Sequence, residues 1–224
     1  MTKRRKKHRP DEIVAKLRDA DAMLNAGKDL AAVLQALEVS DSTLERWRAH
    51  YGRMKCEKAS REDPDSPTLA LVRADFIGTT GSEEQIASTY RELLERKDLS
   101  PRQTAVAANN LAFHLAKPDT AAEAEKLVTV AIAELGPHPD VLDTRGVVLL
   151  AAGKGQEAIA DLKEALLVPT ATKYLHLAAV LASQDQLGAA RQALAEAKKR
   201  GFVTRQLSAS DQQRLRAIEA SLGE

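Results

Sequence analysis

Small residues recur at a fixed spacing in the second half of the chain. Ala112, Gly146 and Ala178 are separated by 34 and then by 32 residues. The positions 3, 12, 16 and 19 residues after each of them are also apolar, namely Leu115, Ala124, Val128, Ala131, Leu149, Ala158, Leu162, Ala165, Leu181, Ala190, Leu194 and Ala197. Steps of three and four residues indicate helices, and a repeat of this length indicates stacked two-helix units. The pattern predicts an all-α array of helical hairpins, in which the small residue of each first helix meets the first alanine of the second.

Helix-breaking residues fall between the expected helices, at Gly136-Pro137, Gly153-Lys-Gly155, Val168-Pro169 and Gly201. With these boundaries, residues 105–200 form three units and are similar to the tetratricopeptide repeat. That resemblance implies an α-solenoid, a scaffold whose inner face binds a protein or peptide ligand.

Two further segments flank the three units. Residues 68–104 look like a divergent fourth hairpin, since Ala74, Ile86, Tyr90 and Leu93 keep the internal spacing. Residues 201–224 predict a capping helix over the open end, because a terminal repeat needs a polar outer surface.

Four polar residues on the expected first helices are candidates for ligand contacts. Asn109, Asn110, Arg145 and Lys173 would together clamp a peptide carboxylate or backbone. The alternative is that each lies on an ordinary solvated face.

The other polar residues of the array suggest no chemistry. His114, His138 and His176 lack metal-ligand spacing and are expected at the surface. The acids Glu123, Glu125, Asp161 and Glu164 are expected on helix surfaces, and no phosphate-binding or nucleophile motif is present. We therefore expect no catalytic residues, no metal and no cofactor.

The front of the chain differs in charge from the rest. Residues 1–61 hold 15 Lys/Arg against 9 Asp/Glu, and the remaining residues hold 18 against 23. Residues 1–9 form a basic arm whose cations are Lys3, Arg4, Arg5, Lys6, Lys7 and Arg9. This arm is either a solvated tail or a contact for nucleic-acid phosphates.

Residues 10–56 predict three short helices. The first has an apolar face at Ile13, Leu17, Ala20 and Leu24, and the second at Leu30, Val33, Leu34 and Leu37. After a turn at residues 38–40, Asp41 or Ser42 would cap a third helix whose inner face holds Leu44, Trp47 and Tyr51. The second and third of these helices, with the turn between them, match a helix-turn-helix. In that motif the first helix supports the second, which is held by buried side chains and places its polar face in a DNA major groove.

Specific runs in this head match one family. The runs are Glu12-Ile-Val-Ala-Lys-Leu-Arg18, Gly27-Lys28, Ala36-Leu-Glu-Val-Ser40, Arg46-Trp-Arg48 and Tyr51-Gly-Arg-Met-Lys55. Residues 3–55 thereby resemble the helix-turn-helix domain of insertion-element transposases, which recognises the terminal inverted repeats of the element. The resemblance implies double-stranded DNA as a partner, contacted by the basic arm and by Ser40, Ser42, Thr43, Glu45, Arg46, Arg48, Arg53 and Lys55.

The head departs from the family at three places. Glu38 replaces the turn glycine, where a positive φ would cost glutamate roughly 1 kcal/mol. Leu44-Glu45 replaces an aromatic pair, and Glu45 would either accept from a cytosine or repel phosphate. A polar linker over residues 57–67 replaces the dimerising zipper, which leaves the oligomeric state open.

The single cysteine, Cys56, suggests a reducing compartment. Because no apolar run is long enough to span a bilayer and no secretory signal is evident, we expect a cytoplasmic protein.

Three functions fit these features. The chain is a non-catalytic, sequence-specific DNA-binding protein coupled to a scaffold, a scaffold whose head is a relic, or an accessory to DNA transposition that works with a separate catalytic subunit. The third follows from the resemblance, because in that family catalysis belongs to another domain.

Overall fold

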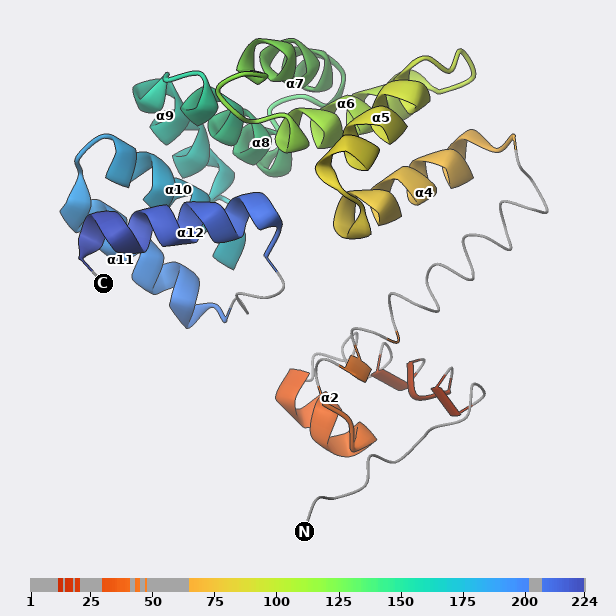
Figure 1. The fold of residues 1–224 in the computed structure, drawn as a ribbon, viewed down its shortest axis with the longest axis horizontal. Helices are drawn as coiled ribbons and strands as arrows, with labels where there is room; N and C mark the ends of the chain where they lie inside the picture. The colour runs from red at the N-terminus through yellow and green to blue at the C-terminus, as the bar shows by residue number, and fades with distance from the viewer. Residues whose placement is uncertain are drawn as a thin grey trace. The chain divides into compact units, whose positions relative to one another are not determined.

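The computed structural model describes residues 12–13, 15–17, 19–20, 30–40, 43–44, 47, 65–201 and 207–223. These residues contain helices and no strands, which confirms the predicted all-α class. They separate into two compact units, Met1–Leu69 and Ala70–Glu224, and each is described by itself. The helices, with the labels of Figure 1, are α2 (Leu30–Leu37), α4 (Pro67–Thr80), α5 (Glu83–Leu94), α6 (Pro101–His114), α7 (Ala121–Leu135), α8 (Pro139–Ala151), α9 (Gly155–Ala165), α10 (Ala171–Ser183), α11 (Leu187–Lys199) and α12 (Ala209–Leu222).

The three predicted repeats are three helical hairpins. Helix α6 pairs with α7, α8 with α9 and α10 with α11, and the first helices also contact one another, α6 with α8 and α8 with α10 (Figure 1). We call the surface formed by α6, α8 and α10 the inner face. All the small and apolar repeat positions that the sequence singles out are buried. The expected array is therefore confirmed as a tetratricopeptide-like α-solenoid.

One close approach of two helices differs from its prediction. A Cβ added to Gly146 of α8 would lie 2.5 Å from the Cγ atom of Leu162 on α9, and its three nearest atoms all belong to that leucine. The glycine therefore makes room for a large side chain one turn beyond Ala158, the predicted neighbour. Leu162 is fully buried at this contact, so the absence of a side chain at residue 146 is required by packing.

Local sequence explains where the helices begin. Ser82 and Ser100 each accept a hydrogen bond from the amide of the glutamine three residues on, whose side chain accepts from the serine amide in return. These two capping boxes satisfy amides that have no partner inside α5 and α6. Gly153 has a φ of +75° in the turn after α8, whereas Gly155, which was expected in the loop, is the first residue of α9.

The segment predicted as a divergent hairpin contains α4 and α5. Ala74, Ile86, Tyr90 and Leu93 are all buried, as their spacing indicates, and belong to one apolar cluster with residues of α6 and α7. This segment extends the core of the array at its N-terminal end.

The described part of the head contains a tight turn after α2. Glu38 has a φ of +54°; its amide donates to the Gln35 carbonyl, and the Val39 amide donates to the Leu34 carbonyl. This pair of bonds is a Schellman motif, which needs a left-handed residue. The backbone keeps the glycine-like conformation with glutamate in it, at the steric cost expected for a side chain in this region.

The next helix of the head begins at an unexpected residue. The Ser40 hydroxyl accepts from the Thr43 amide at 3.3 Å, and the Ser40 carbonyl accepts from the Leu44 amide. These bonds make Ser40 the cap, in place of Asp41 or Ser42, which lie outside the described residues. Leu44 and Trp47 are buried, as predicted for the inward face.

Candidate functional site: a pocket on the inner face and a buried ionic cluster

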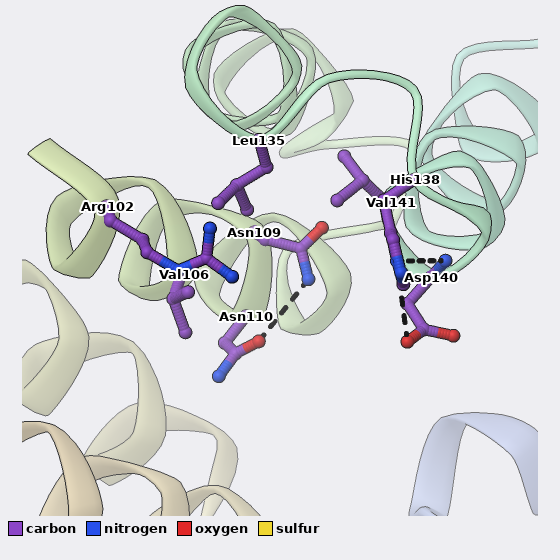
Figure 2. Close-up of a pocket in the computed structure, with 8 residues that line it drawn as sticks. All are labelled: Arg102, Val106, Asn109, Asn110, Leu135, His138, Asp140 and Val141. Atoms are coloured by element: carbon purple, nitrogen blue, oxygen red, sulfur yellow. Dashed lines mark hydrogen bonds and ion pairs between the residues drawn. The ribbon is translucent and has the colours of Figure 1, made fainter.

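A pocket of about 300 Å³ opens between α6 and the start of α8. Figure 2 shows its lining side chains, which come from α6, the last residue of α7 and the first turn of α8. They are Arg102, Val106, Asn109, Asn110, Leu135, His138, Asp140 and Val141. Three of these side chains are aliphatic and five are polar, the mixture typical of a pocket that binds an apolar group and fixes its orientation.

The two adjacent asparagines have different roles in this pocket. Asn110 donates to Asp75 of α4 at 2.8 Å, and the Tyr90 hydroxyl of α5 donates to the same carboxylate oxygen at 2.9 Å. Burial and then the charge of Asp75 raise the pKa of Tyr90, so the phenol stays protonated as a donor. Asn110 therefore ties α6 to the preceding hairpin.

Asn109 keeps unused hydrogen-bonding capacity. Its Nδ2 atom donates to Asn110 Oδ1 at 3.3 Å, whereas its own Oδ1 atom is buried and has no hydrogen-bond partner. An unsatisfied buried acceptor costs about 1–3 kcal/mol. Because the residue lines the pocket (Figure 2), a ligand N–H would remove that cost on binding.

Polar groups lie at two sides of the pocket. Arg102 is exposed and forms no ion pair with any residue in the described part of the chain. On the other side, the His138 Nδ1 atom accepts from the Asp140 amide at 3.4 Å and caps α8. The pocket thus offers a free cation and an orphan acceptor beside an apolar wall.

Arg145, the third predicted ligand contact, is engaged within its own hairpin. Its Nε and Nη2 atoms donate to the two carboxylate oxygens of Asp161 on α9, at 2.5 and 2.6 Å. Asp161 is buried, so its expected surface position is wrong. The bidentate pair fastens α8 to α9, and Arg145 does not line the pocket.

Lys173, the fourth predicted contact, is buried and already paired. Its ammonium donates to the Val168 carbonyl at 3.0 Å and lies 2.7 Å from the Asp140 carboxylate of α8. Arg145 and Lys173 are thus engaged in ion pairs, whereas the two asparagines line the pocket, and the four-residue clamp stays a prediction.

A buried ionic cluster lies elsewhere on the inner face. His176 of α10 is only 1% exposed, which overturns its expected surface position, whereas His138 is exposed as expected and His114 is half-buried. The Nδ1 atom of His176 lies 2.9 Å from Asp143 of α8, and its Nε2 atom lies 3.0 Å from Asp211 of α12. Asp211 also accepts from Arg214 at 2.6 Å and from Ser208 at 2.8 Å.

The cluster keeps its charges in spite of burial. Burial alone would lower the pKa of His176, but the charge of Asp143 and the hydrogen bonds to both carboxylates raise it to about 9. Burial would likewise raise the pKa of Asp211, yet the imidazolium of His176 and then Arg214 hold it well below its usual range. An imidazolium with a carboxylate on each ring nitrogen is therefore the form present at neutral pH.

The pKa values predict how stability depends on pH. His176 binds its proton more tightly in the folded chain, so its contribution of about 3 kcal/mol is complete below pH ~6.5 and is lost as the pH rises through ~9. The contribution of Asp211 is present above its ordinary pKa of about 3.9 and is lost as the pH falls below it. Urea unfolding from pH 5 to 10, compared with His176→Leu, measures the alkaline loss; equal slopes in the two proteins between pH 6.5 and 9.5 would contradict it.

Of the residues predicted to bind DNA, the structure describes two. Ser40 and Thr43 form a hydroxyl pair 2.8 Å apart at the start of the third helix of the head. The others lie outside the described residues, namely Lys3, Arg4, Arg5, Lys6, Lys7, Arg9, Ser42, Glu45, Arg46, Arg48, Arg53 and Lys55. Their grouping on one surface stays a prediction.

Two further features are absent from the described ranges. No group of three or more His, Cys, Asp or Glu there is arranged to hold a metal ion. Within the same ranges, no helix is both long enough and apolar enough to cross a membrane.

Comparisons with known proteins identify the fold. No protein-family model matches the sequence, and no curated protein matches it.

The solved structures that are similar to the chain include the following three proteins. PilW, a widely conserved type IV pilus biogenesis factor, has a TM-score of 0.56 and 20% identity, over 96% of this chain and 88% of its own. TTC0263, a thermophilic TPR protein of Thermus thermophilus, has a TM-score of 0.56 and 18% identity, over 95% of this chain and 100% of its own. PilF of Pseudomonas aeruginosa has a TM-score of 0.51 and 18% identity, over 95% and 90%. At these identities the likeness establishes the fold alone, which is that of the tetratricopeptide-type solenoid.

Proposed function

We propose that the chain is a non-catalytic scaffold that binds an extended segment of a partner protein in the pocket between α6 and α8. The observation that carries this proposal is the orphan Oδ1 atom of Asn109, which would accept a peptide N–H. Arg102 would hold a carboxylate of the same segment, and the aliphatic wall would receive an apolar side chain. The similar solved structures share the fold at low identity, so they name no partner for this chain.

The test separates binding from folding. Random peptides displayed on phage and selected on the full chain would supply a probe, whose affinity is then measured for Asn109→Leu and Arg102→Ala. We expect each variant to bind the probe at least about tenfold more weakly, which corresponds to about 1.4 kcal/mol. Asn109→Leu should unfold within about 1 kcal/mol of the wild type, because it removes an unsatisfied polar atom together with one hydrogen bond.

Lys126→Ala is the matched control for Arg102→Ala. Lys126 is an exposed cation on α7 outside the pocket, and its loss should leave the affinity unchanged. If the selected peptides bind Asn109→Leu as tightly as the wild type, the pocket is not their site.

For the head, we propose binding to double-stranded DNA. The support is the run of matches to transposase heads, the net positive charge of residues 1–61, and a Schellman turn that keeps the family's backbone conformation at Glu38. A helix-turn-helix on a basic arm would read base edges with one helix and neutralise phosphates with the arm.

Salt dependence and substitution test this second proposal on the full chain. The logarithm of the affinity for duplex DNA should fall linearly with the logarithm of salt concentration, with a slope of about −0.9 for each phosphate contacted. Arg46→Ala and Arg48→Ala should each weaken binding by about 1–3 kcal/mol if they read bases. If binding to duplex DNA is not detected at low salt, the chain is a scaffold whose head is a relic.

A gene for an integrase-like catalytic subunit directly downstream would favour the accessory role in transposition.

A further inference from the structure

Helix α12 does more than cover the open end of the array. A capping helix packs on the last hairpin, and α12 does contact α10 and α11 (Figure 1). Its first turns, however, also reach further back along the inner face. The Arg214 guanidinium lies 5.8 Å from the ring centre of Phe113 on α6, two hairpins earlier in the array.

The Asp211 carboxylate is at the centre of the contact between α12 and the inner face. Asp211, in the first turn of α12, meets the Nε2 atom of His176 on α10, and the opposite ring nitrogen of His176 meets Asp143 on α8. Phe113 packs against the same imidazole, with the ring centres 5.8 Å apart. The start of α12 therefore contacts α10 and α6 directly and is linked to α8 through the His176 imidazole. We call Phe113, Asp143 and His176 the carboxylate seat.

The remainder of α12 binds by its apolar side. Leu215, Ile218 and Leu222 are buried in one apolar cluster with residues of α8, α9, α10 and α11. Helix α12 has the features of a helix that binds a groove. Its first turn is capped and carries Asp211, Arg214 follows three residues later, and its apolar residues recur at steps of three and four. Amphipathic helices bind grooves by such anchors.

We propose that α12 is an exchangeable ligand of the inner face, and that the carboxylate seat also receives the first-turn aspartate of a partner helix with the same pattern. This binding surface shares no residue with the lining of the pocket between α6 and α8, so the two sites are tested separately. The chain would then hold its own helix in place until a competing helix displaces it, and the tether gives α12 an advantage in effective concentration that a competitor must overcome.

The charges around His176 make the seat selective for a carboxylate. The charged groups that contact the imidazole are Asp143 from α8 and Asp211 from α12, and Arg214 pairs with Asp211. His114 from α6, whose pKa is lowered by burial, feels the charge of the same Asp211. A neutral side chain in place of the aspartate would leave the imidazolium with one carboxylate partner and Arg214 with none. Breaking a buried pair in this way is strongly unfavourable.

The experiment begins from the folded full chain. A protease recognition sequence inserted after Gly201 allows the chain to be cut after folding, and a fluorescent synthetic peptide of residues 207–224 is then exchanged against the bound α12. We expect the peptide to replace α12, and Asp211→Asn in the peptide to weaken its affinity at least tenfold at pH 7. The affinity of the unchanged peptide should also fall at least tenfold from pH 7 to pH 10, whereas that of the Asp211→Asn peptide should change less.

Glu219→Gln in the peptide is the matched control, because Glu219 pairs with Lys198 at the surface at 3.5 Å and its loss should change the affinity less than twofold. In the uncut chain, amide exchange in α12 relative to α8 should be at least tenfold faster in Asp211→Asn than in Glu219→Gln. Equal affinities of the Asp211→Asn and unchanged peptides, or no exchange of α12 with excess peptide, would overturn the proposal. Neither result bears on the peptide pocket, which is tested by Asn109→Leu.

Discussion

His176→Leu is expected to lower the free energy of unfolding by about 3–5 kcal/mol at pH 7. The leucine fills most of the volume but leaves Asp143 and Asp211 facing an apolar side chain in a site where the imidazole was 1% exposed. Asp143 would lose its cation, and Asp211 would keep only Arg214. Each carboxylate must then either stay charged with less compensation or take up a proton, and both outcomes lower the stability of the folded chain relative to the unfolded chain. Urea unfolding followed by circular dichroism measures the loss.

Two companion variants identify the cause of that loss. His138→Asn replaces an exposed histidine with another good cap residue, so it should change stability by less than about 0.5 kcal/mol. Adding Asp143→Asn and Asp211→Asn to His176→Leu removes the stranded charges and should restore part of the stability. A cost below about 1 kcal/mol for His176→Leu alone would show that the cluster does not hold the fold.

Leu162→Ala is expected to lower the free energy of unfolding by about 2–5 kcal/mol, the range for a fully buried leucine that leaves a cavity. The cavity would open directly against Gly146, because that glycine is shaped around the leucine. Gly146→Ala should cost about 1–3 kcal/mol through overpacking, less the roughly 1 kcal/mol that alanine gains over glycine in a helix. In the double variant the new methyl occupies part of the cavity. The loss of unfolding free energy in the double variant should therefore be smaller than the sum of the losses in the two single variants.

Gly188→Ala provides the control for helix propensity. Gly188 lies in α11, where an added Cβ meets no atom within 4 Å, so this variant should be neutral or more stable by up to about 1 kcal/mol. If Gly146→Ala is as stable as Gly188→Ala, the contact with Leu162 is not a constraint on the sequence. Strict additivity in the double variant would contradict the proposed packing.

The sequence predicts the array well because its signal is apolar and periodic. Ala112, Gly146 and Ala178 are buried at the spacing expected of hairpins, and the breaks at Gly136-Pro137 and Val168-Pro169 fall between helices. Ser100 and Gln103 form a capping box whose spacing is readable from the sequence. These features depend on residues close together in the chain, so local reasoning reaches them.

The polar sites were harder to predict, because their partners are distant in sequence. Arg145 and Lys173 lie on first helices as expected, yet each meets a carboxylate that only the packing of helices brings near. His176 has partners 33 residues before it and 35 after it. One signal was available: these intervals are close to the repeat length, and polar residues separated by a repeat tend to meet across neighbouring units.

The reach of α12 changes how the array should come apart. Repeat proteins approximate one-dimensional chains, in which each unit is stabilised by its immediate neighbours and the ends open first. Here α12 contacts α6 and α10, and the His176 imidazole links its Asp211 to Asp143 of α8, so its release weakens a cluster shared by three units. As an exchangeable helix, α12 should open first, and its removal should then lower the opening free energies of α8 and α10 together. Native-state amide exchange in α8 and α10 measures this effect when the uncut chain is compared with the chain that has lost α12.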